Sequence, residues 1–264
     1  MPLRSSFFRI RVNFLGLAAL VFLLLIWEAC ARLTRLSELY FPPISLVLLT
    51  LVQLVFSGEL VSQALITLFR FATGYALSAT IAVTLGIILG YFRLAYSLFE
   101  GVIEFLRPMP SVAIIPVAIL FLGIGDPMVV AVTVYACTWP ILINTIDGVR
   151  NIDRTLIDTG RTFGLGRWKI LKTIALPAAS PYIFTGLRIS VAIGLILVTT
   201  CEMVVGGSGL GFFILDEERS LKTSNMYAGI ILVAILGYAL NRLFSVLERK
   251  AMRWHRGMRA QGFV

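Results

Sequence analysis

Long apolar segments are the feature that most constrains how this chain can fold. Runs of membrane-spanning length alternate with short polar stretches, and hydrophobic residues make up 58% of the 264 residues while charged residues make up 14%. A soluble domain carries roughly a quarter charged residues and could not hide this much apolar surface in a single core. The bilayer must therefore act as solvent, and helices that satisfy their own backbone hydrogen bonds are expected to cross it. The sequence predicts an all-α membrane protein.

Six segments are predicted to cross the membrane: 14–31, 69–91, 98–123, 128–145, 182–205 and 226–246. A shorter apolar run, residues 44–56, follows two prolines and rises only about 20 Å, which is less than the roughly 30 Å of a hydrocarbon core. We predict an interfacial or re-entrant helix within residues 43–57. The first segment resembles a cleaved signal peptide, but Glu28 and Cys30 spoil the small-residue cleavage site, so a retained helix is favoured.

The segment 98–123 stands apart because it is rich in proline and charge. Proline removes an intrahelical hydrogen bond and kinks a helix, and the freed carbonyls need protein or water nearby. This span is therefore predicted to be kinked and to face the protein interior, with Pro108, Met109 and Pro110 as candidates for lining a pathway. A purely structural kink is the alternative. Its charged residues, Glu100, Glu104 and Arg107, are expected to pair at helical spacing near the cytoplasmic face and not to form a substrate site.

Small residues form two stripes at four-residue spacing, which permits helices in lipid to approach closely. The stripe in the second span consists of Gly74, Ser78, Ala82, Gly86 and Gly90, and that in the fifth span of Gly186, Ser190 and Gly194. Both are predicted to pack against neighbouring helices, with chance placement of glycine as the alternative.

Glu202 is the remaining intramembrane charge that suggests function. A carboxylate costs about 2.5–3.5 kcal/mol to place in the membrane, so it should face the protein interior or the outer interface. A gate or pathway role and a plain polar contact between helices both remain open. The three cysteines lie in or beside apolar runs and the single histidine, His255, lies in the basic tail, which disfavours a metal site. No cluster of His, Asp or Cys suggests a membrane enzyme.

The net charge of +9 is distributed as expected for a membrane protein. With the N-terminus inside, the inner segments hold 18 of the 23 Lys and Arg residues, including Arg4, Arg9 and Arg11 before the first span. Cytoplasmic loops carry such an excess of basic residues. This orientation places both termini and residues 147–173 in the cytoplasm. No basic patch with interleaved aromatic residues suggests nucleic-acid binding.

The polar segment 150–177 carries the pattern most indicative of function. It reads as two short amphipathic helices joined at Gly164, with Pro177 expected to stop the second helix. Phe163 and Trp168 would be exposed on this cytoplasmic loop, so a protein partner is expected. A hairpin lying on lipid headgroups is the alternative.

This segment resembles the EAA loop of permease subunits of binding-protein-dependent ABC importers. The family pattern is Glu-Ala-Ala, three residues, Gly, and a later hydrophobic-x-Leu-Pro. Here the chain has Asp158-Thr159-Gly160, then Gly164, then Ile174-Ala175-Leu176-Pro177. Asp replaces Glu and Thr-Gly replaces Ala-Ala, and glycine costs a helix about 1 kcal/mol relative to alanine. Further segments resemble the nitrate/sulfonate/taurine/bicarbonate branch: 107–110, 122–125, 177–189, 202–203, 207–211 and 226–230.

The resemblance implies a type I ABC importer permease fold in a bacterial inner membrane, with a core domain at residues 41–264 after an N-terminal segment at 1–40. It also implies a second permease copy in a homodimer, two ATPase subunits docked on the loop 150–177, and an extracytoplasmic binding protein. ATP and Mg would be bound by the ATPase subunits, with no cofactor in this chain. The sequence contains no G-x-x-x-x-G-K-[ST] phosphate loop. A stand-alone secondary transporter is the alternative, although few intramembrane charges and no clear repeat suggest one.

Overall fold

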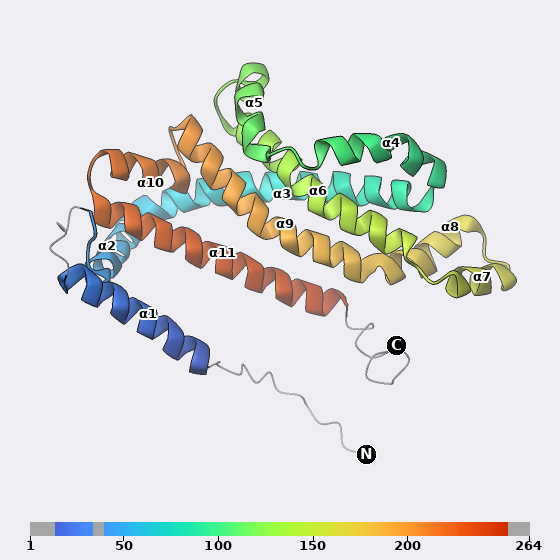
Figure 1. The fold of residues 1–264 in the computed structure, drawn as a ribbon, viewed down its shortest axis with the longest axis horizontal. Coiled ribbons are helices and arrows are strands. Elements are labelled where there is room, and N and C mark those ends of the chain that lie inside the picture. The colour runs from blue at the N-terminus through green and yellow to red at the C-terminus, as the bar shows by residue number, and fades with distance from the viewer. Residues whose placement is uncertain (1–13, 34–39, 253–264) are drawn as a thin grey trace, which may run out of the picture.

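The computed structural model describes residues 14–33 and 40–252, and every regular element in them is helical (Figure 1). Arg4, Arg9, Arg11 and His255 lie outside the described residues. The helices are α1 (Phe14–Leu33), α2 (Ile44–Phe56), α3 (Glu59–Tyr91), α4 (Arg93–Leu106), α5 (Ile115–Leu122), α6 (Asp126–Arg150), α7 (Arg154–Thr162), α8 (Arg167–Ile170), α9 (Leu176–Val205), α10 (Leu210–Arg219) and α11 (Thr223–Ala251). A 3-10 turn (Ser111–Ile114) precedes α5, and a π-helical turn (Leu171–Ala175) joins α8 to α9.

Among the described residues, five helices are long and apolar enough to cross a membrane, or six if the bent pair formed by α4 and residues 111–122 is one span. The predicted all-α membrane fold is confirmed. The short helix α2 has the predicted bounds, and it ends at Ser57 and Gly58, where Gly58 adopts φ +82°. The second span is longer than predicted because α3 begins at Glu59, ten residues before the expected start.

Helix α6 lies at the centre of the bundle, and the stripe of small residues on α3 lies against it. A Cβ added to Gly74 would meet Thr133, and one added to Gly86 would lie 2.6 Å from the Thr145 Cβ. Gly90 faces Val149 in the same way. Since the paired residue numbers increase together, α3 and α6 run parallel. The missing Cβ atoms let the two backbones approach more closely than larger side chains would allow.

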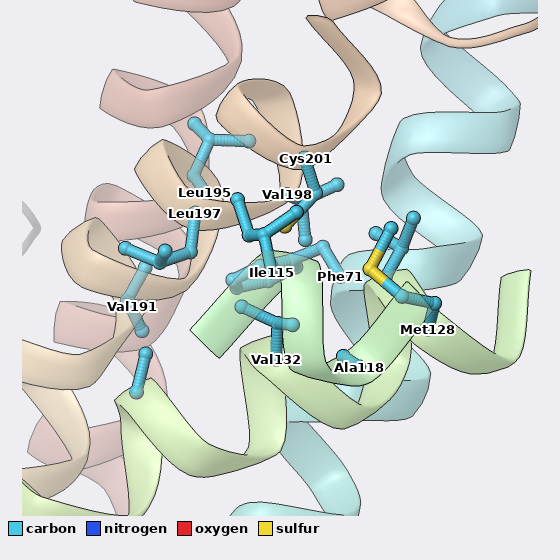
Figure 2. Close-up of a cluster of buried hydrophobic side chains, with 12 residues drawn as sticks. Phe71, Ile115, Ala118, Met128, Val132, Val191, Leu195, Leu197, Val198 and Cys201 are labelled. Atoms are coloured by element: carbon cyan, nitrogen blue, oxygen red, sulfur yellow. The ribbon is translucent and has the colours of Figure 1, made fainter. Parts of the chain in front are cut away.

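The stripe on α9 also lies against α6, in antiparallel orientation. A Cβ on Gly186 would lie 2.8 Å from the Pro140 carbonyl oxygen, and one on Gly194 would lie 2.9 Å from Cys137 Sγ. The Ser190 hydroxyl donates to the Cys137 carbonyl at 3.0 Å. Figure 2 shows the adjoining apolar core, where side chains from α3, α5, α6 and α9 converge. Its members include Phe71, Ile115, Met128, Val132, Leu195, Val198 and Cys201.

The third span differs from the prediction of one kinked helix facing the interior. The chain breaks between Leu106 and Ser111, and the two parts meet at 90°. The break contains Pro108 and Pro110, which have no amide N–H to donate, and Pro110 adopts an extended conformation with φ −62° and ψ 118°. Helix α4 buries none of its side chains within this chain, whereas α5 buries Ile115 and Ala118. The expected pairing of Glu100, Glu104 and Arg107 is also absent from the ion pairs of the described residues.

One further prediction needs correction. Pro177 does not end a helix, because residues 167–205 form one continuous helical stretch. Pro177 is the second residue of α9, directly after the π-helical turn and Leu176, and the helix continues past it although proline has no N–H to donate. The glycine-rich segment 207–211 is helical at its end, because α10 begins at Leu210.

The bundle has two distinct ends. Helices α7 and α8 lie at one end, and α2 and α10 lie at the opposite end (Figure 1). Helix α1 lies beside the bundle and is held there by Trp27, whose indole N–H donates to the Pro42 carbonyl at 3.1 Å. The Trp27 ring also contacts Tyr227 of α11, edge to face, at 5.3 Å between centroids.

Candidate functional site

Helix α7 begins at a side-chain cap. The Asp153 carboxylate accepts a hydrogen bond from the Thr155 amide at 2.8 Å, which satisfies one of the amides that a helix start leaves without a partner. The same hydrogen bond lowers the pKa of Asp153 below its ordinary value. The carboxylate therefore remains ionised, and its charge also suits the positive end of the helix dipole.

The turn after α7 is a Schellman motif built on Gly164. The Leu165 amide donates to the Gly160 carbonyl at 3.0 Å, and the Gly164 amide donates to the Arg161 carbonyl at 2.9 Å. Gly164 has φ +74°, a conformation that side chains with a Cβ rarely adopt. The glycine that the sequence placed between two helices thus provides the turn between them, and α8 follows at Arg167.

The departure from the family pattern at Gly160 has a packing explanation. A Cβ at this position would lie 2.6 Å from Ile174 Cδ1, so Ile174 occupies the space that an alanine would need. Ile170, buried at the end of α8, lies next to it. The contact holds α7 against the segment that leads into α9, and it offsets part of the helical propensity that glycine lacks.

Two large aromatic side chains project from this hairpin of α7 and α8. Phe163 is 80% exposed and Trp168 is 73% exposed, so neither is used in packing within the chain. Asp158 and Thr159 are also exposed, and Asp158 pairs with Arg161 at 3.0 Å. Leu176 and Pro177 lie in the first turn of α9 and are half-buried. The structure thus gathers the predicted loop residues at one end of the bundle.

Glu202 lies at the opposite end, in a buried polar cluster. Its side chain is fully buried and pairs with Arg70 at 3.0 Å. Arg70 also donates to Asp126 at 2.7 Å and to the carbonyl and hydroxyl of Ser208, each at 2.9 Å. The Thr67 hydroxyl is a further donor to the Glu202 carboxylate. This geometry matches the polar helix contact that was left open for Glu202, and Glu202 lines none of the cavities described below.

The same cluster caps the start of α10. The amides of Gly209, Leu210 and Gly211 donate to Gln63, Thr67 and Glu202, respectively, at 2.6–3.0 Å. A Cβ on Gly209 or Gly211 would collide with Glu202 or with the α9 backbone. Side chains from α3 and α9 therefore supply the caps that the glycine-rich sequence cannot provide itself. The ion pair between Arg70 and Glu202 was not predicted from the sequence. Opposite charges in two apolar spans are nevertheless a usable signal for a buried pair.

Two adjoining cavities lie beside the break in the third span. One, of about 500 Å³, lies between α4 and α6 and has Pro108 in its lining. The other, of about 370 Å³, lies between the break, α6 and α9. Arg107 and Ile143 line both. Met109 and Pro110 are exposed and line neither cavity, so the structure does not bring the predicted pathway residues together with Glu202.

A third cavity, of about 850 Å³, lies between the hairpin and the ends of α3 and α6. Five arginines line it: Arg93, Arg150, Arg154, Arg161 and Arg167. One carboxylate, Asp158, is also in its lining. This end of the bundle is therefore strongly basic. The described residues contain no group of His, Cys, Asp or Glu that could hold a metal ion.

The structure is thus a helical membrane bundle with a broken third span and an exposed helical hairpin at one end. The chain belongs to the family of binding-protein-dependent transport system inner membrane components, whose model matches residues 82–253. It is a permease subunit of an ABC transporter, and a stand-alone transporter is not favoured.

Individual relatives agree with this assignment. The putative aliphatic sulfonates transport permease protein SsuC of Bacillus subtilis is 28% identical over 239 residues, which covers 90% of this chain and 87% of that protein. The nitrate import permease protein NrtB of Synechocystis is 33% identical, covering 70% and 68%. A chain of the inward-facing MetNI methionine ABC transporter matches the fold with a TM-score of 0.62 and 18% identity, covering 81% of this chain and 99% of that chain.

Proposed function

We propose that this permease pairs with a second copy of itself to form the pathway of an ATP-driven importer of small oxyanions. Two ATP-binding subunits would hold the ATP and Mg, and an extracytoplasmic binding protein would deliver the substrate. One observation supports the substrate class: the relatives named above carry names for sulfonate and nitrate transport, and both substrates are small oxyanions. The sequence has no phosphate loop, so separate subunits must supply the energy.

The end with the hairpin is proposed to face the cytoplasm, together with both termini. The arginine-lined cavity lies at this end, and basic residues concentrate on the cytoplasmic side of membrane proteins. The opposite end, with α2, α10 and the buried ion pair, would then face outward and receive the binding protein. Glu202 would hold this outer end together rather than act as a gate.

The observation that carries the proposal is the exposure of Phe163 and Trp168 on a hairpin that is otherwise anchored to the bundle. Aromatic side chains in a protein interface bury large areas and often dominate its energy. We propose that both insert into a groove of one ATPase subunit. Movement of the ATPases on ATP binding would pass through α7 and α8 to the continuous helix of residues 167–205, and so reach the membrane core.

Replacement of both aromatic residues tests this role. The change Phe163→Ala with Trp168→Ala should weaken ATPase binding by about 2 kcal/mol or more, roughly 30-fold, because interface anchors cost that much when truncated. Co-purification of tagged permease with its ATPase measures the loss. Phe69→Ala is the matched control, since Phe69 is 64% exposed but lies within the membrane-spanning part of α3. Equal ATPase recovery from all three proteins would refute the docking role.

A further inference from the structure

Arg107 ends α4 at a point halfway along the membrane-spanning helix α6. The carbonyl of the preceding residue, Leu106, accepts a hydrogen bond from the Tyr135 hydroxyl at 3.0 Å, which fixes the end of α4 against α6. Both cavities that Arg107 lines are walled by the central and inner part of α6, from Ala136 to Asp147. Because α6 runs from Asp126 to Arg150, the contact with Tyr135 places the end of α4 beside the middle of α6.

Within the described part of the chain, Arg107 differs from the other membrane arginines because it has no side-chain partner. Arg70 is buried among Asp126, Glu202 and Ser208, and Arg188 lies 4.0 Å from Glu248. The side chain of Arg107 is exposed and forms no ion pair or hydrogen bond with a described residue. An arginine at mid-depth is costly in lipid, and such residues face a water-filled cavity or a partner. The two cavities supply that environment.

The linings of the two cavities differ in charge. Among the described lining residues, Arg107 is the only cation in either cavity. The cavity beside the break adds uncharged polar groups from Ser111 and Asn144. The cavity toward the hairpin end instead contains the carboxylates of Glu100, Glu104 and Asp147. One positive charge therefore lies at mid-depth, with negative charges on the side proposed to be cytoplasmic.

We propose that Arg107 is the residue that recognises the oxyanion inside the permease. Its planar guanidinium can donate two parallel hydrogen bonds to two oxygens of a nitrate or sulfonate group. The ammonium group of a lysine cannot donate such a parallel pair. Glu100, Glu104 and Asp147 line one cavity together with Arg107 and weaken its attraction for an anion, so that a bound anion can also leave. This inference rests on the proposed function and adds that the permease itself, and not only its binding protein, selects for charge.

Uptake by the complete transporter in proteoliposomes tests the inference, with nitrate and methanesulfonate as probes. Arg107→Gln should lower ATP-driven uptake of the transported anion at least tenfold, and Arg107→Lys should retain more of it, while ATPase co-purification stays unchanged. Arg242→Gln is the matched control, because Arg242 is exposed on α11 and lines neither cavity. Wild-type uptake by Arg107→Gln would overturn the role. If the unchanged transporter imports neither anion but does import a neutral solute, the oxyanion assignment fails and the inference falls with it, while the importer function stands.

A second test needs no substrate. In the assembled transporter with Cys30, Cys137 and Cys201 replaced by alanine, Arg107→Cys should react with a charged, membrane-impermeant thiosulfonate reagent. Phe105→Cys is the control, since Phe105 is 74% exposed on the same helix and is expected to face lipid. Reaction at position 107 at least tenfold faster than at 105 supports an aqueous pathway there. Equal, slow reaction at both positions would overturn it, whatever the importer assay shows.

Discussion

At the scale of single residues, Arg70 and Arg107 have different surroundings, and we assign them different roles for that reason. Arg70 satisfies its donors within the chain, through one aspartate, one glutamate and one serine, and it holds three helices and a loop together. Arg107 has no such partners among the described residues and lies between two cavities. A charge that is buried and fully paired has a structural role, whereas an unpaired charge in a polar cavity is available to bind a ligand.

The paired cluster makes a prediction about stability. Glu202→Ala removes the carboxylate that Arg70, Thr67 and the Gly211 amide share, and should destabilise the permease by about 3–5 kcal/mol because a buried charge loses its partner. Thermal unfolding of the purified permease in detergent measures this. Glu218→Ala, at an exposed position on α10, should change stability by less than about 0.5 kcal/mol. A normal melting temperature combined with lost uptake in Glu202→Ala would instead assign Glu202 to the pathway.

Residue-scale features that depend on local sequence could be predicted, and those that depend on distant pairing could not. The turn at Gly164 and the exposure of Phe163 and Trp168 follow from glycine chemistry and from helical spacing over a few residues. The Arg70–Glu202 pair joins residues 132 positions apart, which no local pattern reveals. The position of Arg107 could not be predicted either, because it depends on where α4 ends. The hydrogen bond between Tyr135 and the Leu106 carbonyl fixes that end against α6.

At the scale of elements, small residues and prolines have opposite consequences. The four-residue stripes on α3 and α9 both pack against α6, because they lack large side chains where the α6 backbone approaches. The sequence revealed these stripes, but not that both lie against the same helix. The prolines of the third span indicated a bend, but its size of 90° depends on how α4 and α5 pack, so the sequence suggested only a kink.

The α6–α9 contact can be tested with one alanine. Gly186→Ala places a methyl group 2.8 Å from the Pro140 carbonyl oxygen, and the backbone must shift, at a cost of about 1–3 kcal/mol. Gly101→Ala is the matched control in α4, where a Cβ would meet nothing within 4 Å. There the higher helix propensity of alanine should be neutral or stabilising by up to about 1 kcal/mol. Equal melting temperatures for the two variants in detergent would contradict the close contact between α6 and α9.

At the scale of the whole molecule, three features lie at different places in the bundle. The hairpin of α7 and α8 lies at one end, opposite α2 and α10 (Figure 1). Arg107 and its two cavities lie beside α6, and the Arg70–Glu202 pair joins α3 and α9 near the start of α10. The continuous helix of residues 167–205 joins the hairpin to Glu202 through the membrane. This arrangement suits a subunit that is driven at one end and opens at the other.

The central claim is that this chain transports only when ATPase subunits act on its hairpin, and ATP-driven uptake tests it most directly. Permease, ATPase and binding protein reconstituted in proteoliposomes should accumulate labelled nitrate or methanesulfonate with ATP and Mg, but not with a non-hydrolysable ATP analogue. Accumulation should also be lost when Phe163 and Trp168 are both replaced by alanine. Equal uptake by the purified chain alone, without ATPase or ATP, would contradict the claim.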